Sequence, residues 1–167
     1  SCHLPQQRPI RIEVVDEIAH PFAICLAGFD CDYDRIRIVV RDSYTALVEP
    51  EDPYADFPPE ALVRTLLFHE ITHALIEQNS ADREVPLVDH EYIAAAMELE
   101  HMDPALRETI LHYANLETPA DGRVNIWIYR LDPRRFAANA WLHFRLPRNG
   151  CDLVERLVTG DASFDSQ

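Results

Sequence analysis

The sequence predicts an α+β fold in which a small N-terminal sheet, mixed or mostly antiparallel, packs on a long helix, and a mainly helical half follows. Apolar and polar residues alternate in the first 40 residues, as they do in half-buried strands. A later stretch repeats apolar residues at helical spacing, and two Asp-Pro pairs introduce further helices. Because the chain has no internal repeat and no low-complexity linker, we expect a single domain over residues 1–167.

The strand pattern is confined to the N-terminal third. Residues 10–14 and 35–40 alternate clearly, and each segment is predicted to be a strand. Residues 22–26 are expected as a third strand between them, and residues 46–48 as a short edge piece. A proline-rich acidic loop over residues 50–59 separates this region from the helical half.

The helical half begins after the loop. Pro59 suits the first turn of a helix and Glu60 the positive end of its dipole, so we predict a helix over residues 60–78. Two adjacent apolar stripes run along it, which indicates burial over most of its girth. Four further helices are predicted: over residues 87–101, from Asp103-Pro104 to about residue 116, from Asp132-Pro133 to about residue 144, and after Gly150. Residues 124–129 alternate weakly, as a strand would.

Charge narrows the range of partners. The net charge is −14, from 29 acidic and 15 basic side chains. A field of this sign repels phosphate backbones and anionic membrane surfaces, so nucleic acid is not an expected partner. No apolar run is long enough to span a bilayer, so no membrane span is expected. The simplest interpretation of the acidic excess is that it keeps the protein in solution.

The chain has four cysteines: Cys2, Cys25, Cys31 and Cys151. None forms a Cys-x-x-Cys pair, which argues against a zinc knuckle or a thioredoxin-type site. A turn could bring Cys25 to Cys31, and Cys2 and Cys151 would then tie the two ends, but all three pairings stay open. Disulfides persist in oxidising compartments, so a periplasmic or secreted protein is expected. The start at Ser1 is typical of a chain whose targeting segment was removed. The alternative is four reduced, partly buried thiols.

The most informative stretch is His69-Glu70-Ile71-Thr72-His73, a His-Glu-x-x-His pattern. Residues four apart project from one face of a helix, so the two imidazoles can converge on one ion, and Glu70 lies about 100° round the helix, within reach of a water at that ion. Apart from the motif, residues 66–75 carry no charge, and burying these groups without partners would be expensive. The pattern predicts His69 and His73 as metal ligands and Glu70 as general base. The alternative is a pair of core histidines hydrogen-bonded to their neighbours.

A catalytic zinc site needs a third protein ligand and one open position. A metzincin would supply a histidine six residues after His73, but the chain has Asn79 there, so that class is excluded. The next segment offers Asp89, His90 and Glu91 as third ligands.

With these residues the sequence resembles the gluzincin metallopeptidases, the thermolysin-like and peptidase-MA-like group, in which a glutamate on the following helix completes the site. Glu91 lies 18 residues after His73, and Pro86 stands five residues before it, as in the lead-in of those families. The resemblance covers residues 62–98 and favours Glu91 over Asp89 and His90. It implies a zincin-like fold and one Zn²⁺ ion held by His69, His73 and Glu91.

The resemblance also implies a peptide or protein substrate that pairs with an edge strand upstream of the metal helix. Residues 35–41 or 46–48 are the candidates for that strand. The expected reaction is hydrolysis of a peptide bond by a zinc-activated water, with Glu70 taking its proton and passing it to the leaving amine.

The chain departs from the family pattern at two positions. Tyr92 replaces the glycine that often follows the ligand glutamate, and Ala95 replaces the aspartate that orients a ligand histidine. That orienting partner must therefore be Asp89, Glu98 or a backbone carbonyl. Candidate donors to the negative intermediate are Tyr92, His101, His112, Tyr113 and His143.

Two other functions fit the same residues. One is a zinc-binding, catalytically inactive zincin-like binding module, which a groove blocked by the acidic loop over residues 50–59 would favour. The other is a metal-free interaction domain.

Overall fold

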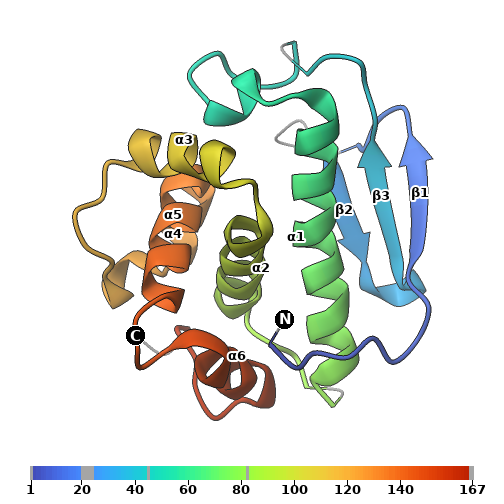
Figure 1. Ribbon diagram of the computed structural model, residues 1–167. Coiled ribbons are helices and arrows are strands. Elements are labelled where there is room, and N and C mark those ends of the chain that lie inside the picture. The colour runs from blue at the N-terminus through green and yellow to red at the C-terminus, as the bar shows by residue number, and fades with distance from the viewer. Residues whose placement is uncertain (1, 20–24, 45, 82, 166–167) are drawn as a thin grey trace.

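A long helix runs through the middle of the molecule, with a sheet on one side and the remaining helices on the other (Figure 1). The computed structural model describes residues 2–19, 25–44, 46–81 and 83–165. The expected α+β architecture is confirmed in its coarse form, with a small mixed sheet and a mostly helical C-terminal half. The strands are β1 (Arg11–Val15), β2 (Ala27–Asp30) and β3 (Arg35–Val39).

The sheet has the order β1-β3-β2, so β3 is central. β1 pairs with β3 in parallel, with Arg11 opposite Arg35, and β2 pairs with β3 antiparallel, with Ala27 opposite Ile38. β2 turns into β3 through the short 3-10 helix η1 (Cys31–Tyr33) and Asp34, which has a left-handed φ of 44°. This tight connection sets which residues of β2 can reach β3.

In the N-terminal third, one strand prediction lies mostly outside the described residues and another was wrong. Of the strand expected over residues 22–26, residues 22–24 lie outside the described part of the chain, Cys25 forms only an isolated bridge with Ile18, and the strand itself begins at Ala27. Residues 46–48 form a turn instead of an edge strand, because the N–H groups of Leu47 and Val48 donate to the Tyr44 carbonyl.

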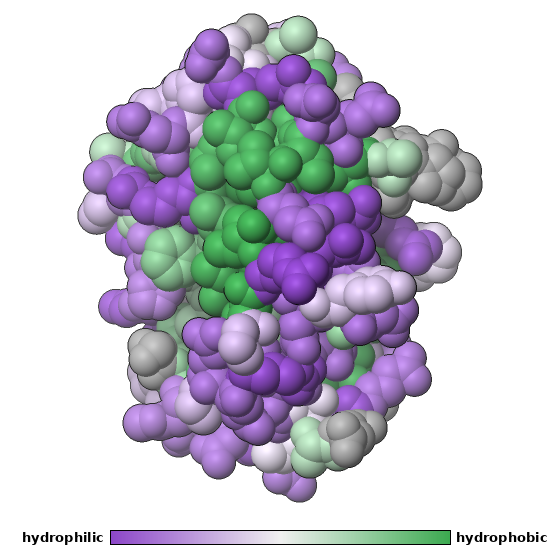
Figure 2. All heavy atoms as spheres, turned by 90° about the vertical axis from the view of Figure 1, so that its right-hand side faces the viewer, coloured by the Kyte–Doolittle hydropathy of each residue, from purple (hydrophilic) through white to green (hydrophobic). Residues whose placement is uncertain are grey.

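β1 forms the outer margin of the sheet. α1 (Pro59–Asn79) packs on β2 and β3, whose Ile36 and Ile38 are fully buried. Ile12 and Val14 of β1 are 49% and 68% exposed. Figure 2 views this side of the molecule and shows apolar atoms gathered in one strip among polar ones.

Side-chain caps start several helices. Asp103 accepts from Ala105 N (2.8 Å) and Asp132 accepts from Arg135 N (3.1 Å), so both Asp-Pro predictions are confirmed. Residues 124–129 were wrongly predicted as a strand, because Asn125 caps a short helix there. The helices after α1 are α2 (Leu87–His101), α3 (Pro104–Ala114), α4 (Ile126–Leu131), α5 (Pro133–Phe144) and α6 (Gly150–Thr159), and the further 3-10 turns are η2 (Pro53–Asp56) and η3 (Asp121–Arg123).

α1 and α2 carry the core. Leu62 and Ile76 of α1 are fully buried, as the two apolar stripes predicted, because the helix is covered by the sheet on one side and by α2 on the other. α2 packs in turn against α5, and Ala94 and Ala96 lie fully buried in this layer. Small side chains let the helix axes approach closely. The motif helix therefore has little freedom to move.

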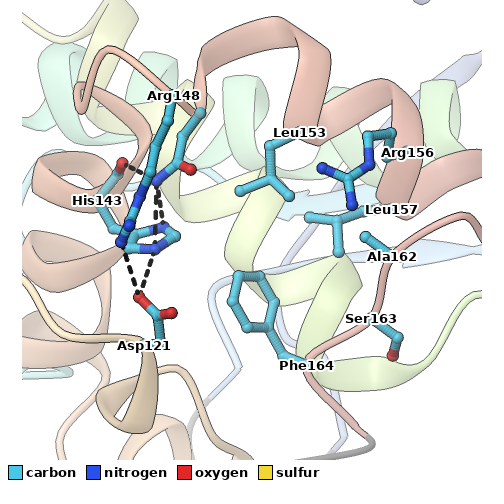
Figure 3. Close-up of a pocket in the computed structure, with 10 residues that line it drawn as sticks. Asp121, His143, Arg148, Leu153, Arg156, Leu157, Ala162, Ser163 and Phe164 are labelled. Carbon is cyan, nitrogen blue, oxygen red and sulfur yellow. Dashed lines mark hydrogen bonds and ion pairs between the residues drawn. The ribbon is translucent and has the colours of Figure 1, made fainter.

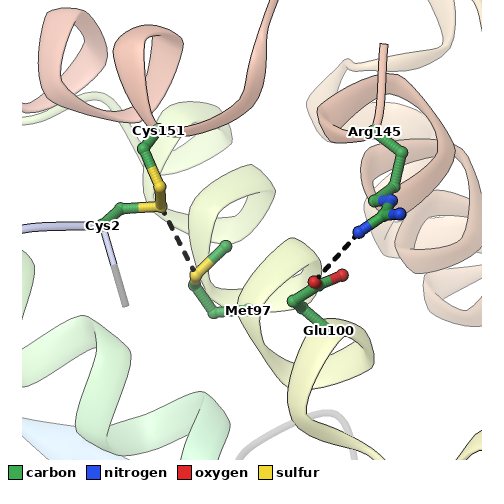
Figure 4. Close-up of a disulfide and its surroundings, with 5 residues drawn as sticks. All are labelled: Cys2, Met97, Glu100, Arg145 and Cys151. Atoms are coloured by element: carbon green, nitrogen blue, oxygen red, sulfur yellow. Dashed lines mark hydrogen bonds and ion pairs between the residues drawn. A yellow bond between two sulfur atoms is a disulfide. The ribbon is translucent and has the colours of Figure 1, made fainter. Parts of the chain in front are cut away.

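A disulfide joins Cys2 to Cys151 at the start of α6, with a Cα–Cα distance of 4.8 Å (Figure 4). The Sδ of Met97 on α2 lies 4.0 Å from the Cys2 sulfur, so the bridge rests on the core. Of the pairings left open by the sequence this one is formed, while Cys25 and Cys31 are free thiols. Among the described helices, none combines the length and the apolar character needed to cross a membrane.

Candidate metal centre

Three side chains from two adjacent helices meet at one point. His69 and His73 lie one turn apart on α1, and their Nε2 atoms are 3.0 Å apart. Glu91, in the second turn of α2, reaches between them, with Oε2 3.3 Å from His69 Nε2 and Oε1 3.7 Å from His73 Nε2. The structure thus brings together the three residues that the sequence predicted as ligands.

Their spacing fits a small tetrahedral cation. Zinc binds nitrogen and oxygen at about 2.0–2.2 Å, which places neighbouring tetrahedral ligand atoms about 3.3 Å apart. The two Nε2 atoms are 3.0 Å apart and lie 3.3 and 3.7 Å from the two Glu91 oxygens, and one ligand atom from each residue lies within 4.8 Å of the others, which is slightly wider than a bound zinc ion would require. Glu91 Oε2 is buried and faces His69 Nε2 at 3.3 Å, and a buried carboxylate oxygen is expensive unless a proton or a cation binds it.

The two rival third ligands lie elsewhere. Asp89 turns toward the C-terminal segment and accepts a hydrogen bond from Phe164 N (2.8 Å). His90 contacts the opposite ring nitrogen of His73, with the two Nδ1 atoms 3.2 Å apart. Among these three consecutive residues, only Glu91 faces both Nε2 atoms.

His69 is oriented by a buried carboxylate. Its Nδ1 lies 2.8 Å from Glu98 Oε2, and Glu98 is only 5% exposed. Glu98 follows Glu91 by two helical turns and so shares its face of α2. When Nδ1–H donates to Glu98, the Nε2 lone pair points toward Glu91 and His73. Of Asp89 and Glu98, the two side chains expected to orient a ligand histidine, Glu98 contacts the His69 ring.

His73 has a different support. With its Nε2 directed toward the centre, its Nδ1 carries the proton and donates to His90 Nδ1. His90 Nε2 then donates to Glu77, whose Oε1 is 3.4 Å away. The His69 imidazole is thus backed by a carboxylate and the His73 imidazole by a second histidine.

The two histidines have opposite pKa shifts. Burial lowers the pKa of His69, but hydrogen bonds to Glu91 and Glu98 outweigh it and raise the pKa well above its usual range. Burial lowers the pKa of His73 to about 3. A proton is therefore held more readily by His69 than by His73.

Glu70 is held beside this cluster by the sheet. The Val39 N–H donates to the Leu26 carbonyl (2.8 Å), so the backbone groups of Leu26 face β3. Because the N–H and C=O groups of successive residues point to opposite sides of an antiparallel strand, the backbone groups of Ala27 and Phe29 face away from β3. The Phe29 N–H donates to the Glu70 carboxylate. Burial is the main cause that raises the pKa of Glu70, and a carboxyl with a raised pKa suits a general base.

The strand expected to meet a substrate was misassigned. Residues 35–41 contain β3, which has neighbours on both sides and therefore offers no free edge. The edge that borders the motif helix is β2, whose Ala27, Gly28 and Phe29 line a pocket of about 580 Å³. The same pocket is lined by His69, Glu70, His73 and Glu91 and by further residues of α1, α2 and the segment between them.

Tyr129 is the pocket residue that sequence reasoning missed. It lies on α4 and its hydroxyl donates to Glu91. Burial is the largest cause that raises the pKa of Tyr129, followed by the Glu91 charge, so the phenol stays protonated. Its segment had been interpreted as a strand, and nothing in the local pattern indicates that it approaches α2.

The donors that were expected from sequence lie away from this pocket. The Tyr92 hydroxyl donates to His143 Nδ1 (2.9 Å), and His101 stacks on Phe68 at 5.1 Å. His143 borders a separate cavity of about 330 Å³ near α6, where its Nε2 donates to Asp121 at 2.9 Å (Figure 3). His112 and Tyr113 are exposed on α3.

The acidic loop does not close the pocket. Residues 50–59 are all described, and none of them lines it. The loop instead forms η2, which packs near α3.

Comparison with known proteins gives one match of family rank. The model of DUF6639, a family of unknown function, matches residues 1–167. No curated protein and no solved structure matches the chain.

Proposed function

The chain belongs to the DUF6639 family, whose function is unknown, and from its own site we propose that it is a zinc-dependent metallopeptidase of the gluzincin type with a zincin-like fold. The observation that carries this proposal is the convergence of His69, His73 and Glu91, whose ligand atoms lie within 4.8 Å of one another, with the Glu70 carboxylate in the same pocket. Two imidazoles and one carboxylate, with Glu70 outside the ligand set, form the donor set of a hydrolytic zinc site.

The catalytic residues have separable roles. When bound, zinc acidifies a water molecule and polarises the substrate carbonyl. Glu70 accepts the proton of that water and returns it to the leaving nitrogen. Tyr129, which is protonated and reaches the site from α4, donates to the developing oxyanion. Glu98 keeps the His69 ring oriented throughout.

An extended peptide would bind along β2. The Phe29 N–H already donates to Glu70. The Ala27 N–H and the Phe29 carbonyl, which also face away from β3, are therefore the groups that would pair with a substrate backbone. Glu77 and Glu84 also line the pocket. In a chain of net charge −14, these walls favour neutral or cationic peptides over acidic ones.

A zinc-binding module without peptidase activity is the second candidate. The observation that favours it is the hydrogen bond from Tyr129 to Glu91, which commits the proposed oxyanion donor to a ligand. Under either candidate, the Cys2–Cys151 disulfide supports a periplasmic or secreted location.

Metal analysis of two variants tests the proposal. The purified protein is expected to carry about one zinc ion per chain, His73→Ala to lose it, and Glu70→Gln to keep it while losing peptide hydrolysis. His112→Ala, an exposed histidine on α3, is the matched control and should keep both zinc and activity. A wild-type protein that takes up no zinc would rule out both candidates, and loaded protein that cleaves no peptide in a library would leave the binding module.

A further inference from the structure

The hydrogen bond that orients His69 does not end at Glu98. The second oxygen of that carboxylate, Oε1, accepts a hydrogen bond from the Tyr54 hydroxyl. Tyr54 belongs to η2, in the acidic loop, and is only 1% exposed. A residue 15 positions before the motif therefore touches the carboxylate that aligns the first ligand.

Arg134 and Asp52 lock Tyr54 in this position. The guanidinium carbon of Arg134, on α5, lies 3.5 Å from the centroid of the Tyr54 ring. Its Nε donates to both oxygens of Asp52, at 3.0 and 3.2 Å. Asp52 also accepts from Tyr54 N (2.9 Å), which caps η2. The loop is thus fixed through its backbone, its ring and its hydroxyl.

The arrangement strengthens the hold on Glu98. A cation over the face of a phenol is attracted to the ring and makes its O–H a better donor. A buried carboxylate is expensive unless its oxygens are hydrogen-bonded, and here one oxygen is bound by Tyr54 and the other by His69. Loss of the Tyr54 donor would free Glu98 to rotate and would release the His69 ring.

We propose that Tyr54 and Arg134 are positioning residues for the metal centre, and that docking of the η2 segment and binding of the metal are coupled through Glu98 and His69. The inference rests on the metal site of the proposed function but not on peptide hydrolysis. Because coupling between two sites is reciprocal, η2 should strengthen metal binding and metal should stabilise docked η2.

Zinc affinity of matched tyrosine variants tests the first half. Tyr54→Phe should weaken zinc binding about 10-fold in a competition assay with a chromophoric chelator, the lower end of the range for loss of a residue that contacts a ligand directly, because Tyr54 acts through Glu98. Tyr44→Phe is the control, since Tyr44 is equally buried and donates to Val39 O (2.8 Å) away from the metal centre. Its zinc affinity should stay within about twofold of wild type.

Spectroscopy separates positioning from general loosening. The visible bands of the Co²⁺-loaded protein report ligand geometry, and they should shift in Tyr54→Phe but not in Tyr44→Phe. Arg134→Lys should weaken zinc binding in the same direction, because lysine lacks the planar fork that spans Asp52 and the ring. Arg107→Lys is its control, because Arg107 lies over the Trp141 ring at 4.7 Å, outside this network.

Hydrogen exchange tests the second half. The amides of Ala55 and Phe57 bond to Asp52 O and Tyr54 O, so they report η2 directly. Zinc should slow their exchange in the wild-type protein and leave it unchanged in Tyr54→Phe.

The outcomes separate the two ideas. If Tyr54→Phe folds and binds zinc and Co²⁺ as the wild type does, the inference is wrong while the zinc site stands. If Tyr54→Phe does not fold, Arg134→Lys against Arg107→Lys decides in the same way. If the wild type takes up no zinc, the proposed function and the inference fall together, whereas zinc binding without peptidase activity removes only the proposed reaction.

Discussion

The disulfide between Cys2 and Cys151 allows a quantitative prediction about stability. It closes a loop of 149 residues. In the chain-entropy model such a cross-link lowers the entropy of the unfolded chain enough to stabilise the folded state by about 5 kcal/mol at 25 °C. For a domain of this size, that corresponds to a melting temperature raised by ~10–20 °C. Because measured disulfides often fall below the model, we expect a loss of about 2–5 kcal/mol on reduction.

Urea unfolding of the oxidised and the reduced protein measures this loss. Reduction is preferable to alanine substitution, because Cys2 is buried against Met97 and truncation would add a cavity to the effect. Thiol titration in denaturant should give two thiols before reduction, Cys25 and Cys31, and four after it. A Cys25→Ala/Cys31→Ala variant should lose the same stability on reduction. An unchanged urea midpoint after complete reduction would refute the entropic argument.

Two further predictions concern the pocket and a surface ion pair. Tyr129→Phe should keep its zinc but lower kcat about 10²-fold, as expected for loss of an oxyanion donor, and an unchanged kcat in a peptide assay would remove Tyr129 from the reaction. The hydrogen bond from Arg8 lowers the pKa of the Asp34 carboxyl in the folded protein. The pair therefore stabilises the fold fully at a pH above the pKa of Asp34 in the unfolded chain, which is about 4, and this stabilisation is lost as the pH falls through the lower pKa of the folded state. Arg8→Ala should therefore unfold at lower urea than wild type at pH 7. The two midpoints should converge as the pH falls below the lowered pKa of Asp34, and a gap that widened in acid would contradict this assignment.

The parts of the fold that sequence predicted well are governed by local signals. Asp-Pro starts define α3 and α5 because one side chain caps each helix within three residues. The spacing of His69 and His73 placed both imidazoles on one face for the same reason, since it depends on a single helical turn. Glu91 was selected among three neighbours through a family resemblance, and its role as a ligand stays a prediction, as does the zincin-like fold.

The parts that sequence missed depend on contacts between distant segments. β2 was expected too early because its position is set by pairing with β3 and by the turn at Asp34. Tyr129 reaches Glu91 and Tyr54 reaches Glu98 from segments far from the motif, and a single sequence contains no sign of either contact. Glu98 could only be named as one of several partners for a ligand histidine, because the choice depends on how α1 and α2 pack.

The close approach of the three proposed ligand side chains has a practical consequence. Helices that form the core already hold the imidazoles and the carboxylate in place, so uptake of a cation would demand almost no rearrangement of the backbone. Preparations with and without the ion would then elute from a sizing column at the same volume and give the same far-ultraviolet circular dichroism. Occupancy must accordingly be counted by elemental analysis, since an inactive sample could be a well-folded one that lost its metal to a chelating buffer or a nickel column.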